Sequence, residues 1–208
     1  MATPLSQRIG IWIIAIFMLL GVVGTSLVMV LSMNSQANDK VKYQNALKEY
    51  QEKVAAQTKN LSDKYYPEFK NYASIPAIFT TDDIKKLATS DLKVGDGAEI
   101  KSNTAYSAYY IGWNPKGVVF DQSIENGALK FPISGGSMIS GWEEGVVGMK
   151  VGGVRELTIP SEKAYGSTGK GDDIPPNTPI KFIVMVIPQV AEVPIPEALL
   201  KYYQQNSQ

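Results

Sequence analysis

The side chains that most often carry out covalent chemistry are scarce in this sequence. It contains no histidine and no cysteine, which excludes a thiol nucleophile, an imidazole general base and a Cys/His zinc site. The neighbouring carboxylates Glu143 and Glu144 would point about 100° apart on a helix, and they are better explained as exposed acids in a first helical turn. Asp172 and Asp173 form a pair without further ligands for a cation. We therefore expect no metal and no cofactor.

A second group of residues is informative through its order. It comprises Ser140-Gly-Trp-Glu-Glu-Gly145, then Glu162-Lys-Ala-Tyr-Gly-Ser-Thr-Gly169 and then Ile174-Pro-Pro-Asn177, with Tyr109-Tyr110 and Phe120-Asp121 upstream. Each motif alone is weak, but together they closely resemble the signature of FKBP-type peptidyl-prolyl cis-trans isomerases. The resemblance covers residues 91–190, about half of the chain.

The resemblance implies a pocket that binds proline. Its floor would be Trp142. The backbone N–H of Ile139 and the hydroxyl of Tyr165 would donate hydrogen bonds to the substrate. Asp121 would orient neighbouring polar groups. The resemblance also implies that Tyr110, Phe120 and Phe182 form the walls of the pocket. Three further residues would lie at its edge: Leu129, Met138 and Ile174. Taken alone, aromatic residues in strands are usually core residues.

The implied activity is rotation about the peptide bond before proline, which faces a barrier of about 18–20 kcal/mol. A rotamase needs no nucleophile, which agrees with the absence of histidine and cysteine. The alternative is a non-catalytic FKBP-like module that holds a proline-containing partner. General chaperone activity would need an inserted apolar domain, and the loop from Tyr165 to Ile174 is too short to contain one. Binding of macrolide inhibitors follows from the same resemblance, although Leu129 and the loop 170–173 depart from the family pattern.

Short β-like runs alternate with turns and are interrupted by one expected helix at about 140–149. We expect an α+β fold in which an antiparallel sheet wraps around this helix, and the resemblance implies the same architecture for an isomerase domain at 76–190. A short capped helix is also expected at 81–87. The expected strands are 105–113, 117–121, 128–133, 154–159 and 180–187.

Residues 9–33 contain no charged residue. As a helix they would span about 37 Å, compared with about 30 Å for the bilayer core. After a short tail at 1–8, this segment predicts a transmembrane signal anchor, with Ser35-Gln-Ala37 as an alternative cleavage site. Flanking charges do not fix its orientation; the layout favours an extracytoplasmic C-terminal domain that assists folding of exported or surface proteins. The twenty basic and twenty acidic residues cancel, so nucleic acid is not an expected partner.

Residues 34–75 predict a helical stalk. Tyr43, Leu47, Tyr50, Val54 and Leu61 follow a helical period. This stripe fits an amphipathic helix lying on the domain, a spacer, or a short coil that forms a homodimer. At its end, Phe69 and Tyr72 are candidates to pack on the domain. The C-terminal tail at 191–208 predicts a linker and a short helix at a solvated end.

Overall fold

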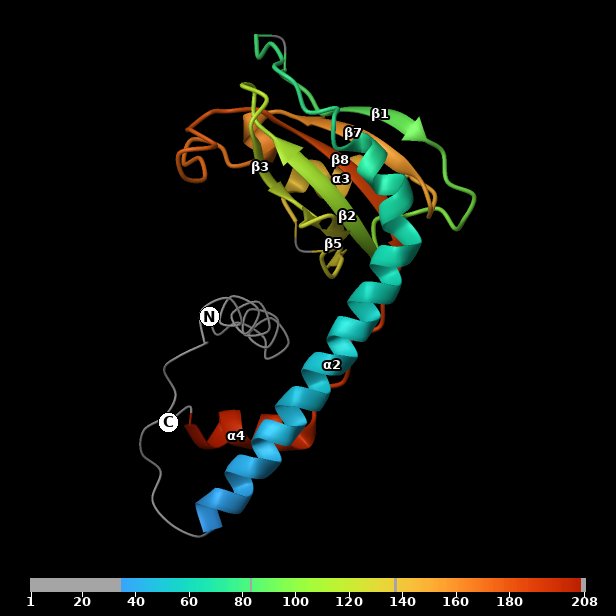
Figure 1. The fold of residues 1–208 in the computed structure, drawn as a ribbon. Helices are drawn as coiled ribbons and strands as arrows, with labels where there is room; N and C mark the ends of the chain where they lie inside the picture. The colour runs from blue at the N-terminus through green and yellow to red at the C-terminus, as the bar shows by residue number, and fades with distance from the viewer. Residues whose placement is uncertain (1–34, 83, 137, 207–208) are drawn as a thin grey trace.

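The computed structural model describes residues 35–206 except residues 83 and 137. One long helix, α2, and an antiparallel sheet dominate it (Figure 1). The elements, in chain order, are α2 (Ser35–Phe69), the 3-10 turn η1 (Lys70–Tyr72), β1 (Ala88–Lys93), β2 (Tyr106–Trp113), β3 (Val119–Gln122), β4 (Ile124–Glu125), β5 (Ala128–Leu129), β6 (Ile133–Ser134), α3 (Ser140–Val146), β7 (Val154–Ile159), the 3-10 turn η2 (Ser161–Lys163), β8 (Ile180–Pro188) and α4 (Glu197–Asn206).

The main sheet has the strand order β1-β7-β8-β2-β3, with β6 also paired to β2, and these strand pairs are antiparallel. β4 and β5 form a separate hairpin. The prediction of an α+β fold, with an antiparallel sheet against one short helix, is confirmed. The run at 154–159 forms β7 with the predicted bounds. The run predicted at 128–133 is divided between β5 and β6.

Both faces of the central strands are buried, because side chains alternate between two hydrophobic layers. On β2, Ala108 faces the inner layer that contains α3, while Tyr109 and Ile111 face the outer layer. On β8, Phe182 belongs to the inner layer and Ile183 to the outer one. Strands buried on both sides appear in sequence as nearly continuous hydrophobic runs, as 182–187 does.

The C-terminal end of α2 covers the outer face of the sheet (Figure 1). Phe69 is fully buried there, with its ring centroid 6.1 Å from that of Tyr109. Ser62 Oγ accepts a hydrogen bond of 2.9 Å from the Leu129 N–H, which ties the helix to β5. The predicted packing of Phe69 and Tyr72 on the domain is confirmed. The outer core therefore includes residues of the stalk that precede residue 76.

The N-terminal half of α2 packs against the C-terminal tail. Tyr50 and Val54 from the predicted stripe form a small core with Leu199 of α4, and the rings of Tyr43 and Tyr202 stack at 4.1 Å. Leu199 is only 2% exposed, so the prediction of a solvated tail is wrong. A short helix was expected in this tail and is present as α4, but its apolar partner on α2 is distant in sequence, so no local pattern indicated the contact.

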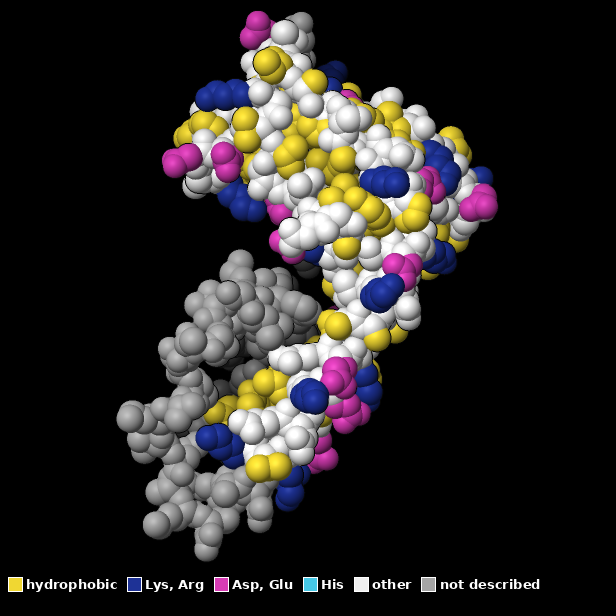
Figure 2. All heavy atoms as spheres, viewed as in Figure 1, with side chains coloured by type: hydrophobic (Ala, Val, Ile, Leu, Met, Phe, Trp, Pro, Cys, Tyr) yellow, Lys and Arg dark blue, Asp and Glu magenta, His cyan; other side chains and the backbone are white. Residues whose placement is uncertain are grey.

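The exposed side of α2 is charged. Figure 2 shows lysine and acidic side chains interspersed along it. Glu49 and Lys53 are paired at 2.7 Å, and Lys59 and Asp63 at 2.6 Å, each with the i,i+4 spacing of helical neighbours. Such exposed pairs contribute little to stability, because solvent screens the two charges. We conclude that packing on the sheet and on the tail, rather than surface charge, stabilises this helix.

Two helix predictions need correction. Around the undescribed residue 83, the segment 81–87 contains a turn and no helix, with the Ile84 N–H bonded to the Thr81 carbonyl at 3.1 Å. Pairing of β1 with β7 begins at Ala88 and requires extended chain immediately after this segment. The helix predicted at 140–149 ends at Val146. Gly148 follows with φ +80°, a conformation typical of glycine just beyond a helix.

Among residues 35–206, with 83 and 137 left out, no helix is long and apolar enough to cross a membrane. The predicted anchor at 9–33 and the tail at 1–8 lie outside the described residues.

We predict that Phe69→Ala lowers the free energy of unfolding of the full chain by about 3–5 kcal/mol, because a fully buried ring is lost from the outer layer. Urea unfolding measures the change. Ile78→Ala is the control, because Ile78 is 81% exposed and its loss should cost no more than about 0.5 kcal/mol. Equally small losses in the two variants would show that the end of α2 is not part of the core.

Candidate functional site

A cluster of four aromatic rings lies on the inner face of the sheet, where three strands meet α3. Phe182 is central: its ring centroid is 5.2 Å from Trp142, 5.5 Å from Phe120 and 6.2 Å from Tyr110, and all three contacts are edge to face. Tyr110 also meets Trp142 at 5.7 Å and 84°. Trp142 and Phe182 are buried, whereas Tyr110 and Phe120 are half-buried. The structure thus brings together the predicted floor and the three predicted walls, and the cluster reaches the surface.

Gly112 makes this arrangement possible. It lies on β2 between Asp121 of β3 and Phe182 of β8 in the strand register. A Cβ atom here would collide with the Phe182 ring and lie 2.8 Å from the Phe120 ring. Gly112 was not among the residues predicted to form the site. A glycine inside an otherwise bulky strand is nevertheless a recognisable sign of close approach by another group.

Tyr106 supports the floor and was also missed. Its hydroxyl accepts a hydrogen bond of 3.0 Å from the Trp142 indole Nε1–H, which fixes the orientation of the indole plane. Gly135 lies against the Tyr106 ring, where a Cβ atom would clash. Burial raises the pKa of Tyr106 to about 12. The hydroxyl therefore stays protonated at neutral pH.

Tyr110 and Asp121 form the polar edge of the cluster. The Tyr110 hydroxyl donates a hydrogen bond of 2.6 Å to Asp121 Oδ2, so the aspartate orients this wall of the site. Burial, followed by the hydrogen bond to Asp121, raises the pKa of Tyr110 far above its ordinary value. Lys130 Nζ lies 4.0 Å from Asp121 Oδ1, and both side chains are close to half exposed. Such a surface pair contributes little to stability.

The loop before α3 is held by the helix itself. Glu143 Oε1 accepts hydrogen bonds from the backbone N–H groups of Gly136 at 2.9 Å and Met138 at 3.0 Å. The sequence predicted an exposed first-turn acid at Glu143. The side chain is instead half-buried, because it satisfies two backbone donors of the preceding loop. Glu144 is exposed and pairs with Lys163 at 2.5 Å.

Ile139 is the N-cap residue of α3, in an extended conformation, and its carbonyl accepts the N–H groups of Trp142 and Glu143. Within the described part of the chain, no acceptor takes the N–H of Ile139 itself. A backbone donor at a helix N-terminus is well suited to a substrate carbonyl. Met138 and Ile139 both pack on the inner core.

The loop after η2 brings two further predicted residues to the inner core, the half-buried Tyr165 and the buried Ile174. Lys170 Nζ lies 5.2 Å from the Tyr165 ring centroid and 3.4 Å from its hydroxyl. Leu129 does not join them. It is buried in the outer layer with Phe69, so its predicted place at the edge of the pocket is not supported. Leu129 contacts α2, which is distant in sequence, and a comparison of local motifs cannot show such a contact.

The site combines apolar rings with a few hydrogen-bond donors. In the described residues no group of three or more acidic side chains is placed to hold a metal ion. An apolar surface of this kind can bind a proline ring. The Ile139 N–H and the Tyr165 hydroxyl are candidate donors to carbonyl groups of the peptide that contains this proline.

Comparison with known proteins agrees with this geometry. The profile of the family described as FKBP-type peptidyl-prolyl cis-trans isomerase matches residues 97–187. An FK506-binding protein of Neisseria meningitidis serogroup A is 40% identical over 102 residues, which are 49% of this chain and 94% of the relative. A probable FK506-binding protein of Corynebacterium glutamicum is 43% identical over 103 residues, 49% of this chain and 85% of the relative.

FK506-binding protein 4 of Rhizopus delemar is 40% identical over 101 residues, and the match spans 49% of this chain but only 26% of that longer relative. The near-complete coverage of the bacterial relatives is decisive. The chain belongs to the FKBP-type peptidyl-prolyl cis-trans isomerase family.

We predict that turnover on short proline peptides is nearly flat between about pH 6 and 8. The chain has no histidine or cysteine, whose ordinary pKa values lie nearest this range. Tyr106 and Tyr110 stay protonated throughout, because burial raises both pKa values. A pH profile of kcat/KM measures this, and a bell-shaped curve centred near pH 7 would contradict it. Because the folded tyrosines hold their protons more tightly than the unfolded chain does, their contribution to the free energy of unfolding should be fully present below about pH 10 and be lost as the pH rises further.

Proposed function

We propose that Tyr110, Phe120, Trp142 and Phe182 form the proline-binding site of this isomerase and that the N–H of Ile139 binds a substrate carbonyl. The observation that carries the proposal is the edge-to-face cluster on Trp142, directly beside the N-terminus of α3. A planar amide is more polar than a twisted one, because resonance separates its charge. An apolar site therefore disfavours the planar ground state relative to the twisted transition state.

In this proposal the polar groups hold one half of the amide while the other half rotates. Ile139 and Tyr165 donate hydrogen bonds, and Asp121 keeps the Tyr110 ring in place through its 2.6 Å hydrogen bond. No proton transfer or covalent intermediate is required. The bacterial relatives are named FK506-binding proteins, and we propose that FK506 occupies the same aromatic surface here and competes with peptides.

We predict that Phe120→Ala lowers kcat/KM on a proline tetrapeptide by about 10- to 100-fold, equivalent to roughly 1.4–2.7 kcal/mol, because a wall is lost and water enters. Asp121→Leu should reduce it less, because orientation is lost while the apolar surface remains. The measurement is a protease-coupled isomerisation assay on the full chain in detergent, with FK506 inhibition as a check that the site is responsible.

Val119→Ala is the matched control for Phe120→Ala. Val119 is the neighbouring residue of β3 but packs against the outer layer, so its variant should keep kcat/KM within about twofold. Wild-type activity in Phe120→Ala would refute the site. It would also shift the interpretation towards a binding module that holds proline-containing partners without catalysis.

We further propose that residues 9–33 anchor the chain in a membrane and that the isomerase domain lies outside the cytoplasm, where it assists folding of exported proteins. Support comes from the 25 uncharged residues at 9–33 and from α2, which begins immediately afterwards. Its 35 residues extend about 52 Å at 1.5 Å per residue. A spacer of this length would hold the aromatic site away from a bilayer surface.

Orientation is tested by adding protease to intact cells or spheroplasts that contain the full chain. We expect the domain to be digested while cytoplasmic control proteins survive, because an outward-facing domain is accessible before lysis. Protection of the domain until the cells are lysed would place it in the cytoplasm and overturn the proposed role with exported proteins.

A further inference from the structure

Three residues of β7 hold α3 against the sheet. Ile159, Leu157 and Arg155 alternate along the strand on its inner face. Ile159 lies against Gly141 so closely that a Cβ atom there would clash, and a Cβ atom on Gly145 would lie 2.7 Å from the Leu157 side chain. The first two contacts are apolar and set the distance between helix and sheet. The third is polar and lies at the C-terminal end of the helix.

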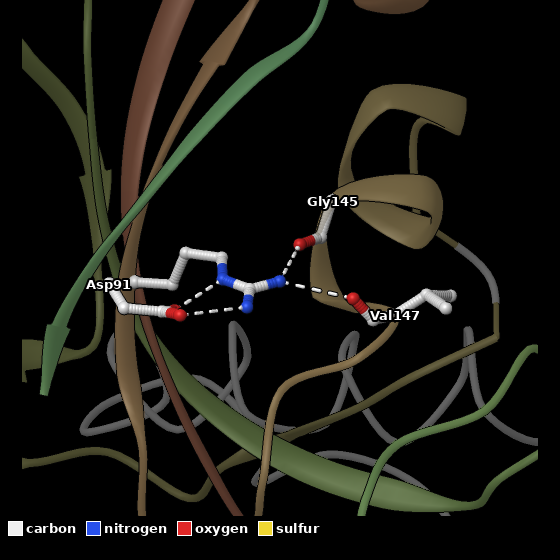
Figure 3. A network of polar contacts seen from close by, with 4 residues as sticks. Asp91, Gly145 and Val147 are labelled. Carbon is white, nitrogen blue, oxygen red and sulfur yellow. Dashed lines mark hydrogen bonds and ion pairs between the residues drawn. The ribbon is translucent and has the colours of Figure 1, made fainter. Parts of the chain in front are cut away.

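Arg155 binds the end of α3 and β1 at once (Figure 3). Its Nη1 donates to the carbonyl oxygens of Gly145 at 2.9 Å and Val147 at 3.1 Å. Its Nε and Nη2 donate to the two carboxylate oxygens of Asp91, at 2.6 and 3.1 Å. The Arg155 side chain is only 11% exposed.

The last carbonyl groups of a helix have no partner inside it and carry partial negative charge. A planar guanidinium can satisfy two of them while it forms a two-point pair with a carboxylate. The hydrogen bond from Arg155 keeps the pKa of Asp91 below its ordinary value, so the pair stays charged at neutral pH. α3 has only seven residues, and a tilt at its C-terminal end would therefore also move its N-terminal end.

We propose that Arg155, oriented by Asp91, is a positioning residue for isomerisation. Through the end of α3 it sets the place of the Trp142 indole and the Ile139 N–H, the two groups of the proposed site that this helix carries. The inference rests on that site. The hydrogen bonds of Arg155 go to Asp91 and to the carbonyl groups of Gly145 and Val147, so in this proposal Arg155 itself touches no reacting atom.

The chain offers a matched control on the same strand. Glu156, the next residue of β7, forms a 2.7 Å ion pair with Lys181 of β8, and its side chain is about one-fifth exposed. Lys181 lies over Phe79 of the outer layer, so this pair does not contact α3. Glu156→Gln removes an ion pair from β7 without freeing the helix.

The test compares Arg155→Met, Arg155→Lys, Asp91→Asn and Glu156→Gln in the full chain. We expect Arg155→Met to lower kcat/KM about tenfold, mainly through kcat, because small misplacement of positioned groups slows the chemical step more than it weakens binding. Arg155→Lys keeps the charge without the fork and should recover part of the loss. Asp91→Asn should fall between Arg155→Lys and wild type, and Glu156→Gln should match wild type.

Position is measured separately from activity through the NMR signal of the Trp142 indole N–H, identified by its loss in Trp142→Phe. We expect this signal to shift in both Arg155 variants and to stay in place in Glu156→Gln, even where the melting temperatures of the variants fall equally. If Arg155→Met does not fold, Arg155→Lys and Asp91→Asn decide the question by the same two readouts.

Wild-type kcat/KM and an unmoved indole signal in Arg155→Lys and Asp91→Asn would overturn this inference. Loss of activity in Phe120→Ala alongside that result would leave the proposed site intact. Wild-type activity in Phe120→Ala and Trp142→Phe would instead overturn the site, and the role of Arg155 with it.

Discussion

The close contact between α3 and β7 determines where the functional groups of this domain lie. Gly141 and Gly145 present no side chains to the sheet, so Ile159 and Leu157 approach the helix backbone directly. A larger residue at either glycine would move the helix outwards. The indole of Trp142 would then leave the Phe182 ring, now 5.2 Å away, and the hydroxyl of Tyr106. The proposed binding surface therefore depends on the distance between helix and sheet, and interiors packed at high density transmit such shifts readily.

The second constraint is that the sheet is covered on both faces. The inner layer is closed by α3 and the outer layer by the end of α2, with Phe69 fully buried between the stalk and β2. This separates two tasks. Residues on one side of β2 contribute to the aromatic cluster, while those on the other side pack against the stalk. The tail then returns to α2 through Leu199, so the stalk is bound to the chain at two places along its length.

The sequence predicted the local and motif-based features well. The β-like run at 154–159 predicted β7 with its observed bounds, and motif order identified the rings at Tyr110, Phe120, Trp142 and Phe182, which the structure brings together. Features set by distant partners were missed. Leu129 faces α2 instead of the site, and Leu199 is buried by a helix about 150 residues earlier in the chain. The capping pattern at 81–87 did not produce the predicted helix, because the pairing of β1 requires extended chain immediately after this segment.

The most direct test of the proposed site is to locate a bound proline peptide on the full chain by intermolecular NOEs. We predict contacts from the proline ring protons to the Trp142 indole and the Phe182 ring, together with a shift of the Ile139 amide signal on titration. Contacts confined to the outer layer, for example to Tyr65 of α2, or unchanged Trp142 and Ile139 signals at saturating peptide, would contradict the proposed site.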